Sequence, residues 1–208
     1  WDEEDYRAGY GAPANSLILN RNELGFISIP NRAGQPLSIV WERPEFVRGW
    51  RIENNTRTVG SGYEYIDAGQ RPGQKVMSVR GQLIAGTSSD NSSIALLDPG
   101  SYFAEQFQQS LNAYGMPTAR AQATTGGVPS GLVELAAIQS PPLRAFIDPT
   151  NLYSVNIYAE SMLKTLGRSV EPNTPDAYAS GADAVSRVLT ALGVRPGSVS
   201  IVDGSGLS

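Results

Sequence analysis

Residues 154–160, Ser-Val-Asn-Ile-Tyr-Ala-Glu, place a hydroxyl and a carboxamide two positions apart at the start of a predicted helix. The side chains of Ser154 and Asn156 are close enough in sequence to reach into one cleft from that helix start. Serine and asparagine are also the favoured residues for capping the first turn of a helix. The stretch taken alone therefore leaves two interpretations open, a pair of functional side chains and a simple N-cap.

The helix predicted over residues 157–166 has an apolar and a polar face. Spacings of three and four residues bring together one apolar set, which consists of Tyr158, Ala159, Met162 and Leu166. On the polar face, Ser161 and Lys164 have the S-x-x-K spacing of a serine nucleophile and its lysine base. Glu160 and Lys164 are i, i+4 neighbours, which predicts an exposed ion pair. This polar face is thus either a nucleophile site or an ordinary solvated surface.

The rest of the second half alternates between predicted helices and short strands. Residues 101–114 are predicted to form a helix capped by Ser101, and residues 175–192 a longer helix closed by Gly193. Proline in the first turn predicts a short helix after residue 140, ended by Asp148-Pro149. Strands are predicted over 131–138 and 198–202, and a glycine-rich loop over 203–208.

The first half is predicted to be a small β unit, because short apolar stretches alternate with turn signals about every ten residues. The clearest strand covers residues 75–83, where Met77 and Val79 share one face and Ser78 and Arg80 the other. Residues 16–19 and 24–29 are predicted to pair as a hairpin. Further strands are predicted over 37–41 and 48–52. The expected fold class is therefore α+β, or mixed.

Composition excludes several classes of function. The 208 residues carry a net charge of −4 and contain only two lysines, Lys75 and Lys164, with no basic stripe for nucleic acid. There is no histidine and no cysteine, which excludes Ser-His-Asp and thiol catalysis and Cys/His metal sites. No apolar run reaches the roughly 18 residues of a membrane span. A chain without cysteine is compatible with an oxidising compartment.

The acidic residues at the start and the glycine-rich loop at the end have weak general meanings. Asp2, Glu3, Glu4 and Asp5 form either a solvated charge run or a surface for a cationic group. The loop over 203–208 is not a phosphate loop, because no lysine follows it, and not an esterase elbow, because the chain has no histidine.

An ordered series of motifs carries a family resemblance. Ser-Pro-Pro-Leu (140–143), Ser-x-Asn-x-Tyr-Ala-Glu (154–160), Gly-x-x-Ala-Val (181–185) and Asp-Gly-Ser-Gly-Leu-Ser (203–208) follow one another. Trp-x-x-x-Asp (1–5) and Tyr-Gly-Ala-Pro (10–13) stand at the start. The set resembles the class C low-molecular-mass penicillin-binding proteins, the D-alanyl-D-alanine carboxypeptidase/endopeptidase family (peptidase family S13).

This resemblance implies part of a serine β-lactamase/transpeptidase-like domain together with inserted small β-rich domains. Residues 1–13 and 87–138 would form an inserted α/β domain, and residues 14–86 an inserted small β domain. Residues 139–208 would belong to the penicillin-binding domain.

The resemblance also implies roles for individual residues. Ser154 would relay a proton to the leaving amine, and Asn156 would donate its amide to a substrate carbonyl. Asp5 would bind a free amino group of the substrate, in a pocket lined by Tyr10. A wall near the acyl group would be formed by Ser205, Gly206 and Leu207. Neither a metal nor a cofactor is implied.

The departures from the family pattern concern the nucleophile. The family's S-x-x-K is expected before Trp1 and its K-T-G after Ser208, so the sequence is interpreted as an internal fragment. Ser161 and Lys164 follow the S-x-N motif, which is the wrong order, and are rejected as nucleophile and base. Val155 stands where the family usually has aspartate.

By resemblance, the substrate is a peptidoglycan stem peptide, cleaved through an acyl-enzyme, and β-lactams are inhibitors. The expected location is periplasmic or extracytoplasmic, associated with the cell wall. Two other classes stay open: a non-catalytic peptidoglycan-binding or scaffolding protein of the same fold, and a glycosidase that uses paired carboxylates.

Overall fold

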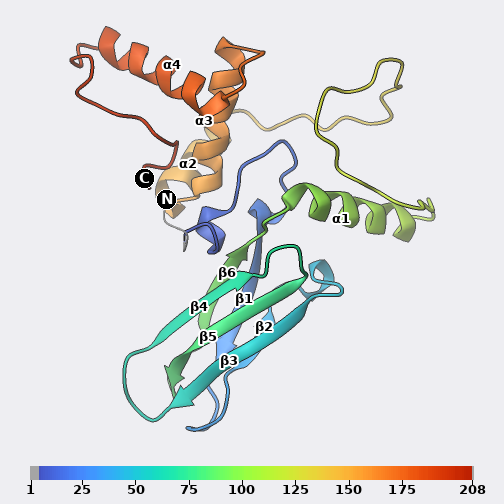
Figure 1. The fold of residues 1–208 in the computed structure, drawn as a ribbon, viewed down its shortest axis with the longest axis vertical. Coiled ribbons are helices and arrows are strands. Elements are labelled where there is room, and N and C mark those ends of the chain that lie inside the picture. Colours follow the sequence, from blue (N-terminus) through green and yellow to red (C-terminus); the bar gives the residue numbers. More distant parts are fainter. Residues whose placement is uncertain (1–4, 208) are drawn as a thin grey trace. The chain divides into compact units, whose positions relative to one another are not determined.

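A computed structural model describes residues 5–207 and separates into two compact units, Trp1–Gln122 and Ala123–Ser208 (Figure 1). The described part of unit 1, residues 5–122, contains three short 3-10 helices, six strands and one α-helix. These are η1 (Gly9–Gly11), η2 (Asn20–Asn22), β1 (Glu23–Ile29), β2 (Ser38–Trp41), η3 (Pro44–Phe46), β3 (Arg51–Val59), β4 (Tyr65–Gln70), β5 (Val76–Ile84), β6 (Asp90–Ala95) and α1 (Pro99–Ala113). Unit 2 contains α2 (Arg144–Tyr153), α3 (Asn156–Val170) and α4 (Ala177–Ala191). The mixed fold class is confirmed.

Two three-stranded sheets form unit 1. One has the order β2-β1-β6 and is antiparallel throughout. The other has the order β3-β5-β4, in which β5 pairs in parallel with β3 and antiparallel with β4. Side chains from both sheets meet in one buried cluster, to which β1 contributes Phe26, β5 contributes Met77 and Val79, and β6 contributes Ile94. The alternation predicted for β5 is confirmed, because Met77 and Val79 are fully buried and Arg80 is exposed.

Helix α1 follows strand β6 of the first sheet and adds Tyr102 to the same core (Figure 1). Its N-cap is Asp98, whose carboxylate accepts from the Ser101 N–H at 3.0 Å, so the cap predicted at Ser101 is wrong by three residues. This hydrogen bonding with Ser101 lowers the pKa of the Asp98 carboxyl below its usual value. The i, i+4 spacing of Phe103, Phe107 and Leu111 predicts an apolar face for this helix. That face is not the buried one, because Tyr102 is buried while Phe107 is 54% exposed.

The hairpin predicted between residues 16–19 and 24–29 is not formed. Asn20, Arg21 and Asn22 all have positive φ, which turns the chain through η2 instead of into a hairpin. The fully buried Asn22 side chain accepts from Leu19 N–H and donates to the Pro13 carbonyl, so it anchors the preceding segment without a strand. Strand β1 pairs with β2 and β6.

Unit 2 is helical in its regular part. The strands predicted over 131–138 and 198–202 are both without regular structure. A strand requires a neighbour for its backbone hydrogen bonds, and the described part of unit 2 contains no strand that could pair with them. Asp148-Pro149 does not end a helix, because α2 continues through Pro149 to Tyr153. The helices predicted over 157–166 and 175–192 are confirmed as α3 and α4.

The expected division into residues 1–13 with 87–138, 14–86 and 139–208 stays a prediction. The structure groups the chain more coarsely, and β6, from residues 87–138, pairs with β1, from residues 14–86, in one sheet. Every helix within residues 5–207 is too short or too polar to cross a membrane.

The buried position of Met77 predicts a large stability loss on truncation. Met77→Ala is expected to lower the free energy of unfolding by about 2–5 kcal/mol, because it leaves a cavity between the two sheets. Met116→Ala is the matched control, since Met116 is 52% exposed and its truncation is expected to change stability by about 0.5 kcal/mol or less. Denaturant unfolding of both variants measures the difference, and equal losses would contradict the core assignment.

Candidate functional site

The junction between α2 and α3 projects Ser154 outward. Ser154 is the C-cap residue of α2 and has left-handed backbone angles, φ 51° and ψ 46°. Such angles are uncommon for residues other than glycine, and residues that adopt them concentrate at functional sites. The side chain of Ser154 is exposed. Its hydroxyl is therefore presented on the surface by a backbone turn that is sparsely populated elsewhere.

Asn156 begins helix α3 and is half-buried. The N-cap residue is the buried Val155, and it makes no side-chain capping hydrogen bond. The N-cap interpretation of Ser154 and Asn156 is therefore wrong. The ring of Tyr158 contacts the ring of Phe146 edge-on, with 5.4 Å between centroids, so that α2 packs against the start of α3 and fixes the junction.

The glycine-rich loop over residues 203–207 is shaped by side chains that accept from its backbone. Glu160 of α3 accepts from the N–H groups of Gly204 and Ser205, at 3.2 Å and 2.9 Å. Asp203 accepts from the N–H of Gly206 at 2.6 Å. The Ser205 hydroxyl accepts from the N–H of Leu207 at 3.4 Å. Four successive backbone donors are thus satisfied by side chains, which gives the loop a defined conformation.

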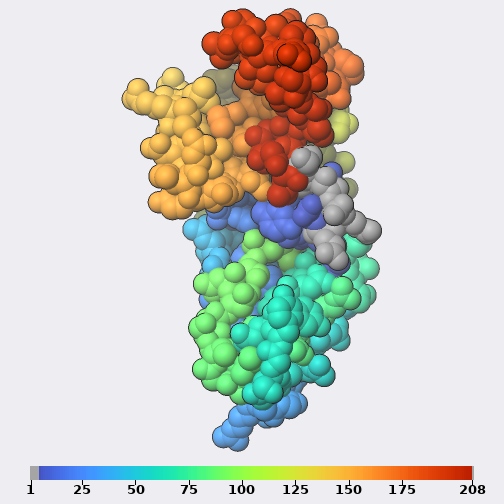
Figure 2. Space-filling view, turned by 90° about the vertical axis from the view of Figure 1, so that its left-hand side faces the viewer, coloured from blue at the N-terminus to red at the C-terminus, as the bar shows by residue number. Residues whose placement is uncertain are grey.

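The loop lies directly on the backbone of α3. A Cβ atom added at Gly204 would overlap the carbonyl oxygen of Ala159, so this position requires glycine. Ala159 and Glu160 are three and four residues after Asn156, which is one helical turn or about 6 Å along the axis. Figure 2 shows the C-terminal residues, in dark red, against the orange atoms of the helices. Ser154, Asn156 and the loop are therefore carried by the same end of α3.

Helices α3 and α4 approach closely along the middle and the C-terminal part of α3. A Cβ atom at Gly167 would overlap the carbonyl oxygen of Ala177, and one at Gly181 would overlap the carbonyl oxygen of Leu163. Gly167 therefore lies inside α3 as a contact residue, and the helix continues past its predicted end at residue 166 to Val170.

The S-x-x-K pair on α3 is not arranged as a nucleophile and base. The Ser161 hydroxyl donates to the carbonyl of Ile157 at 2.6 Å, one turn back on its own helix. The Lys164 ammonium lies over the ring of Tyr178, 4.8 Å from its centroid. This geometry agrees with the exclusion of Ser161 on motif order.

Asp5 and Tyr10 belong to unit 1 and are close together there. The Tyr10 hydroxyl donates to Asp5 Oδ1 at 2.7 Å, and the Tyr10 side chain is 50% exposed. Trp1, Asp2, Glu3 and Glu4 lie outside the described residues. The substrate-binding roles of Asp5 and Tyr10 stay predictions, as do those of Ser154, Asn156, Ser205, Gly206 and Leu207.

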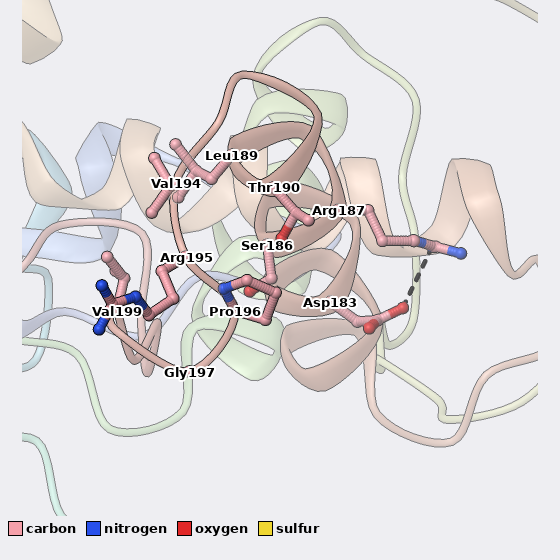
Figure 3. Close-up of a pocket in the computed structure, with 10 residues that line it drawn as sticks. All are labelled: Asp183, Ser186, Arg187, Leu189, Thr190, Val194, Arg195, Pro196, Gly197 and Val199. Carbon is pink, nitrogen blue, oxygen red and sulfur yellow. Dashed lines mark ion pairs between the residues drawn. The ribbon is translucent and has the colours of Figure 1, made fainter.

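A separate pocket of about 330 Å³ lies between α4 and residues 194–199 (Figure 3). Its rim carries the ion pair between Arg187 and Asp183, with 3.2 Å between nitrogen and oxygen. None of the predicted site residues lines it. Within residues 5–207, no group of three or more acidic side chains is close enough together to hold a metal ion.

Sequence reasoning missed Glu160. The predicted exposed ion pair is wrong, because the Glu160 side chain is only 3% exposed. A signal was present in the spacing, since the apolar residues Ile157 and Leu163 lie three positions before and after Glu160, on its side of a helix. All three are buried in the structure. A carboxylate in register with two buried apolar residues indicates a buried acceptor rather than a surface charge.

The fold defined by these elements is that of a penicillin-binding protein. Penicillin-binding protein 4 (dacB) from Haemophilus influenzae has a TM-score of 0.72 at 19% identity, with 100% of this chain and 46% of that chain covered. The same protein in complex with a β-lactam has a TM-score of 0.70 at 19% identity, with 96% and 45% covered.

Sequence comparison gives the family. The model of the D-Ala-D-Ala carboxypeptidase 3 (S13) family matches residues 1–208, and the chain belongs to this family. A D-alanyl-D-alanine carboxypeptidase from Actinomadura sp. (strain R39) is 25% identical over 218 residues, covering 100% of this chain and 40% of the relative. The chain thus spans less than half the length of the relatives it matches.

The close approach of α3 and α4 predicts the effect of a small substitution. Gly181→Ala is expected to destabilise unit 2 by about 1–3 kcal/mol, because the added methyl group meets the backbone of α3. Helix propensity alone would favour alanine by about 1 kcal/mol, so the sign of the change tests the contact. Gly127→Ala in the same unit, with open space around it, is the control. Thermal unfolding followed by circular dichroism is the measurement, and a stabilised Gly181→Ala variant would contradict the packing.

Proposed function

We propose that the protein containing this chain is a serine-type D-Ala-D-Ala carboxypeptidase/endopeptidase that acts on peptidoglycan stem peptides. Membership of the S13 family supports the activity class. The observation that carries the proposal is the arrangement at the start of α3. An exposed Ser154 hydroxyl and the Asn156 carboxamide stand one helical turn from a glycine loop whose N–H groups are held by the same helix.

The reaction divides peptide cleavage into two acyl transfers. A serine hydroxyl oxygen attacks the carbonyl carbon of the penultimate D-alanine, its proton passes to a base, and an ester forms. The terminal D-alanine leaves as an amine after receiving a proton. Water then attacks the ester, releases the shortened peptide and restores the serine. The nucleophile and its lysine base are not assigned to any of the described residues, since Ser161 donates to its own helix.

Residues of this chain would assist those steps. The Ser154 hydroxyl is proposed to relay the proton to the leaving nitrogen, because an exposed hydroxyl both donates and accepts. Asn156 is proposed to donate its side-chain amide to a carbonyl of the substrate. Residues 205–207 are proposed to line the acyl group. These roles require the hydroxyl, the carboxamide and the loop to keep fixed separations, which one rigid helix end provides.

Recognition of the peptide stem would use a separate carboxylate. Asp5 is proposed to bind the free amino group of the stem, with Tyr10 holding the carboxylate through its hydroxyl bond at 2.7 Å. Charge-assisted hydrogen bonds between an ammonium group and a carboxylate are stronger than neutral ones, which suits selection of a cationic group.

β-Lactams are proposed to acylate the serine in the same way as the substrate does. The enzyme is proposed to act in the periplasm or at another extracytoplasmic location associated with the cell wall.

A non-catalytic peptidoglycan-binding or scaffolding protein of the same fold is the alternative function. Val155 in the middle of the S-x-N motif favours this alternative, since the family usually has a carboxylate there.

The role of Asn156 is tested by Asn156→Ala in the full-length product of the gene. Labelling by a fluorescent penicillin is expected to slow by about 100-fold or more, the order of magnitude lost when a positioned donor is removed. The melting temperature is expected to stay close to that of the unaltered protein, because Asn156 does not cap α3. Asn151→Ala, in an exposed position of α2, is the matched control and is expected to label normally.

Two outcomes of this experiment would count against the proposal. Normal labelling of Asn156→Ala would contradict the assigned role of the carboxamide. An unaltered full-length protein that takes up no penicillin would favour the non-catalytic alternative.

A further inference from the structure

Glu160 is a buried carboxylate that the proposed reaction steps do not use. Its side chain is 3% exposed, and it lies on the face of α3 that also buries Ile157 and Leu163. Burial of a carboxylate is costly unless hydrogen bonds replace the lost water. A residue that only filled space here would be apolar, so the carboxylate indicates a specific set of donors.

The donors are two successive backbone N–H groups of the glycine loop. Oε2 of Glu160 accepts from Gly204 at 3.2 Å, and Oε1 accepts from Ser205 at 2.9 Å. Using both oxygens fixes the loop at two points, so that it can neither slide along α3 nor rotate about a single bond. Hydrogen bonds to an ionised acceptor are about twice as strong as neutral ones.

Internal bonds of the loop give it shape but not position. Asp203 and Ser205 accept from Gly206 and Leu207, and all four residues belong to the loop itself. The bonds to Glu160 bridge 44 and 45 positions in sequence and attach the loop to the helix. The absence of a side chain at Gly204 then allows the loop to rest on the carbonyl of Ala159.

We infer that Glu160 is a positioning residue, which sets the distance between the glycine loop and the Ser154 and Asn156 side chains at the start of α3. This inference rests on the proposed function, in which the loop lines the acyl group. Loss of the carboxylate would leave the helices folded while the loop moves away from the reacting groups. Acylation would then slow although Glu160 touches neither substrate nor nucleophile.

Glu160→Gln is the most informative substitution. Glutamine keeps the volume and one acceptor oxygen, but its NH2 group is a donor and would face a loop N–H. Glu171→Gln is the matched control, because Glu171 is exposed and lies at the other end of α3, where its side chain accepts from the Ser180 hydroxyl.

Hydrogen–deuterium exchange followed by mass spectrometry of the full-length product measures the loop directly. Glu160→Gln is expected to speed exchange in the peptide containing residues 203–207 by about tenfold or more, while exchange in peptides from α4 stays unchanged. Glu171→Gln is expected to exchange like the unaltered protein. Unchanged exchange of the loop in Glu160→Gln would overturn the inference.

Penicillin labelling separates positioning from general stability. The rate constant of acylation per folded molecule is expected to fall about tenfold or more in Glu160→Gln. The dissociation constant of penicillin in the non-covalent complex that precedes acylation is expected to change less. A purely structural role would lower the melting temperature and leave acylation of the folded fraction unchanged, which would also overturn the inference.

A second variant guards against a folding defect. Gly204→Ala displaces the loop from its own side, through the overlap with Ala159, and is expected to slow acylation similarly. Both substitutions disturb the same contact. The free-energy cost to acylation in the double variant should therefore be much smaller than the sum of the costs in the two single variants. Additive losses would contradict a shared contact.

An error in the proposed function would be recognised separately from an error in the role of Glu160. If the unaltered protein takes up no penicillin, the proposed activity is wrong, and loop exchange in Glu160→Gln still decides whether Glu160 holds the loop.

Discussion

A buried carboxylate requires hydrogen-bond donors, and in this chain that requirement links helix α3 to the glycine loop at the C-terminal end of unit 2. Glu160 meets it with the backbone N–H groups of Gly204 and Ser205, which draws a segment of irregular chain onto the first turn of α3. The loop has no neighbouring strand within the described residues, so its place depends on these bonds and on the contact of Gly204 with Ala159. The candidate site exists as a unit only because this contact brings the loop to the helix end that carries Asn156.

The same helix is also held further along its length, by α4. Glycine at positions 167 and 181 lets the backbones of α3 and α4 approach more closely than any side chain would permit. Phe146 adds an edge-on ring contact from α2 to Tyr158. Packing on these faces restricts the direction of α3, and with it the directions of Ser154 and Asn156. Precision at the candidate site is therefore a consequence of helix packing rather than of loop contacts alone.

Sequence patterns predicted the elements whose side chains repeat with a clear period. Strand β5 and helices α3 and α4 were predicted because their apolar residues recur in the sequence with a period of two or of about 3.6. The strands predicted over 131–138 and 198–202 failed because apolar composition cannot supply a hydrogen-bonding neighbour. The hairpin before β1 failed because three consecutive positive φ angles at residues 20–22 are not visible in a turn-forming composition.

The candidate site was also predicted only in part. Its residues were predicted from motif order, but their geometry was not. The left-handed backbone at Ser154 and the buried state of Glu160 both depend on tertiary contacts, with α2 and with the glycine loop. The i, i+4 spacing predicted an ion pair between Glu160 and Lys164. The hydrogen-bond donors of Glu160 in the glycine loop lie more than forty residues away in sequence.

Pairing of β1 with β6 has a consequence for how unit 1 reaches its native state. Glu23 is opposite Ala95, so the first sheet closes a loop of roughly seventy residues that contains the whole of the second sheet. Loop-closure entropy for such non-local contacts has to be overcome before they stabilise anything, which slows folding. During synthesis on the ribosome, β1 would wait without this partner until the chain has grown past residue 95. The backbone N–H and C=O groups along that edge of β1 would meanwhile be unpaired and open to association with other chains.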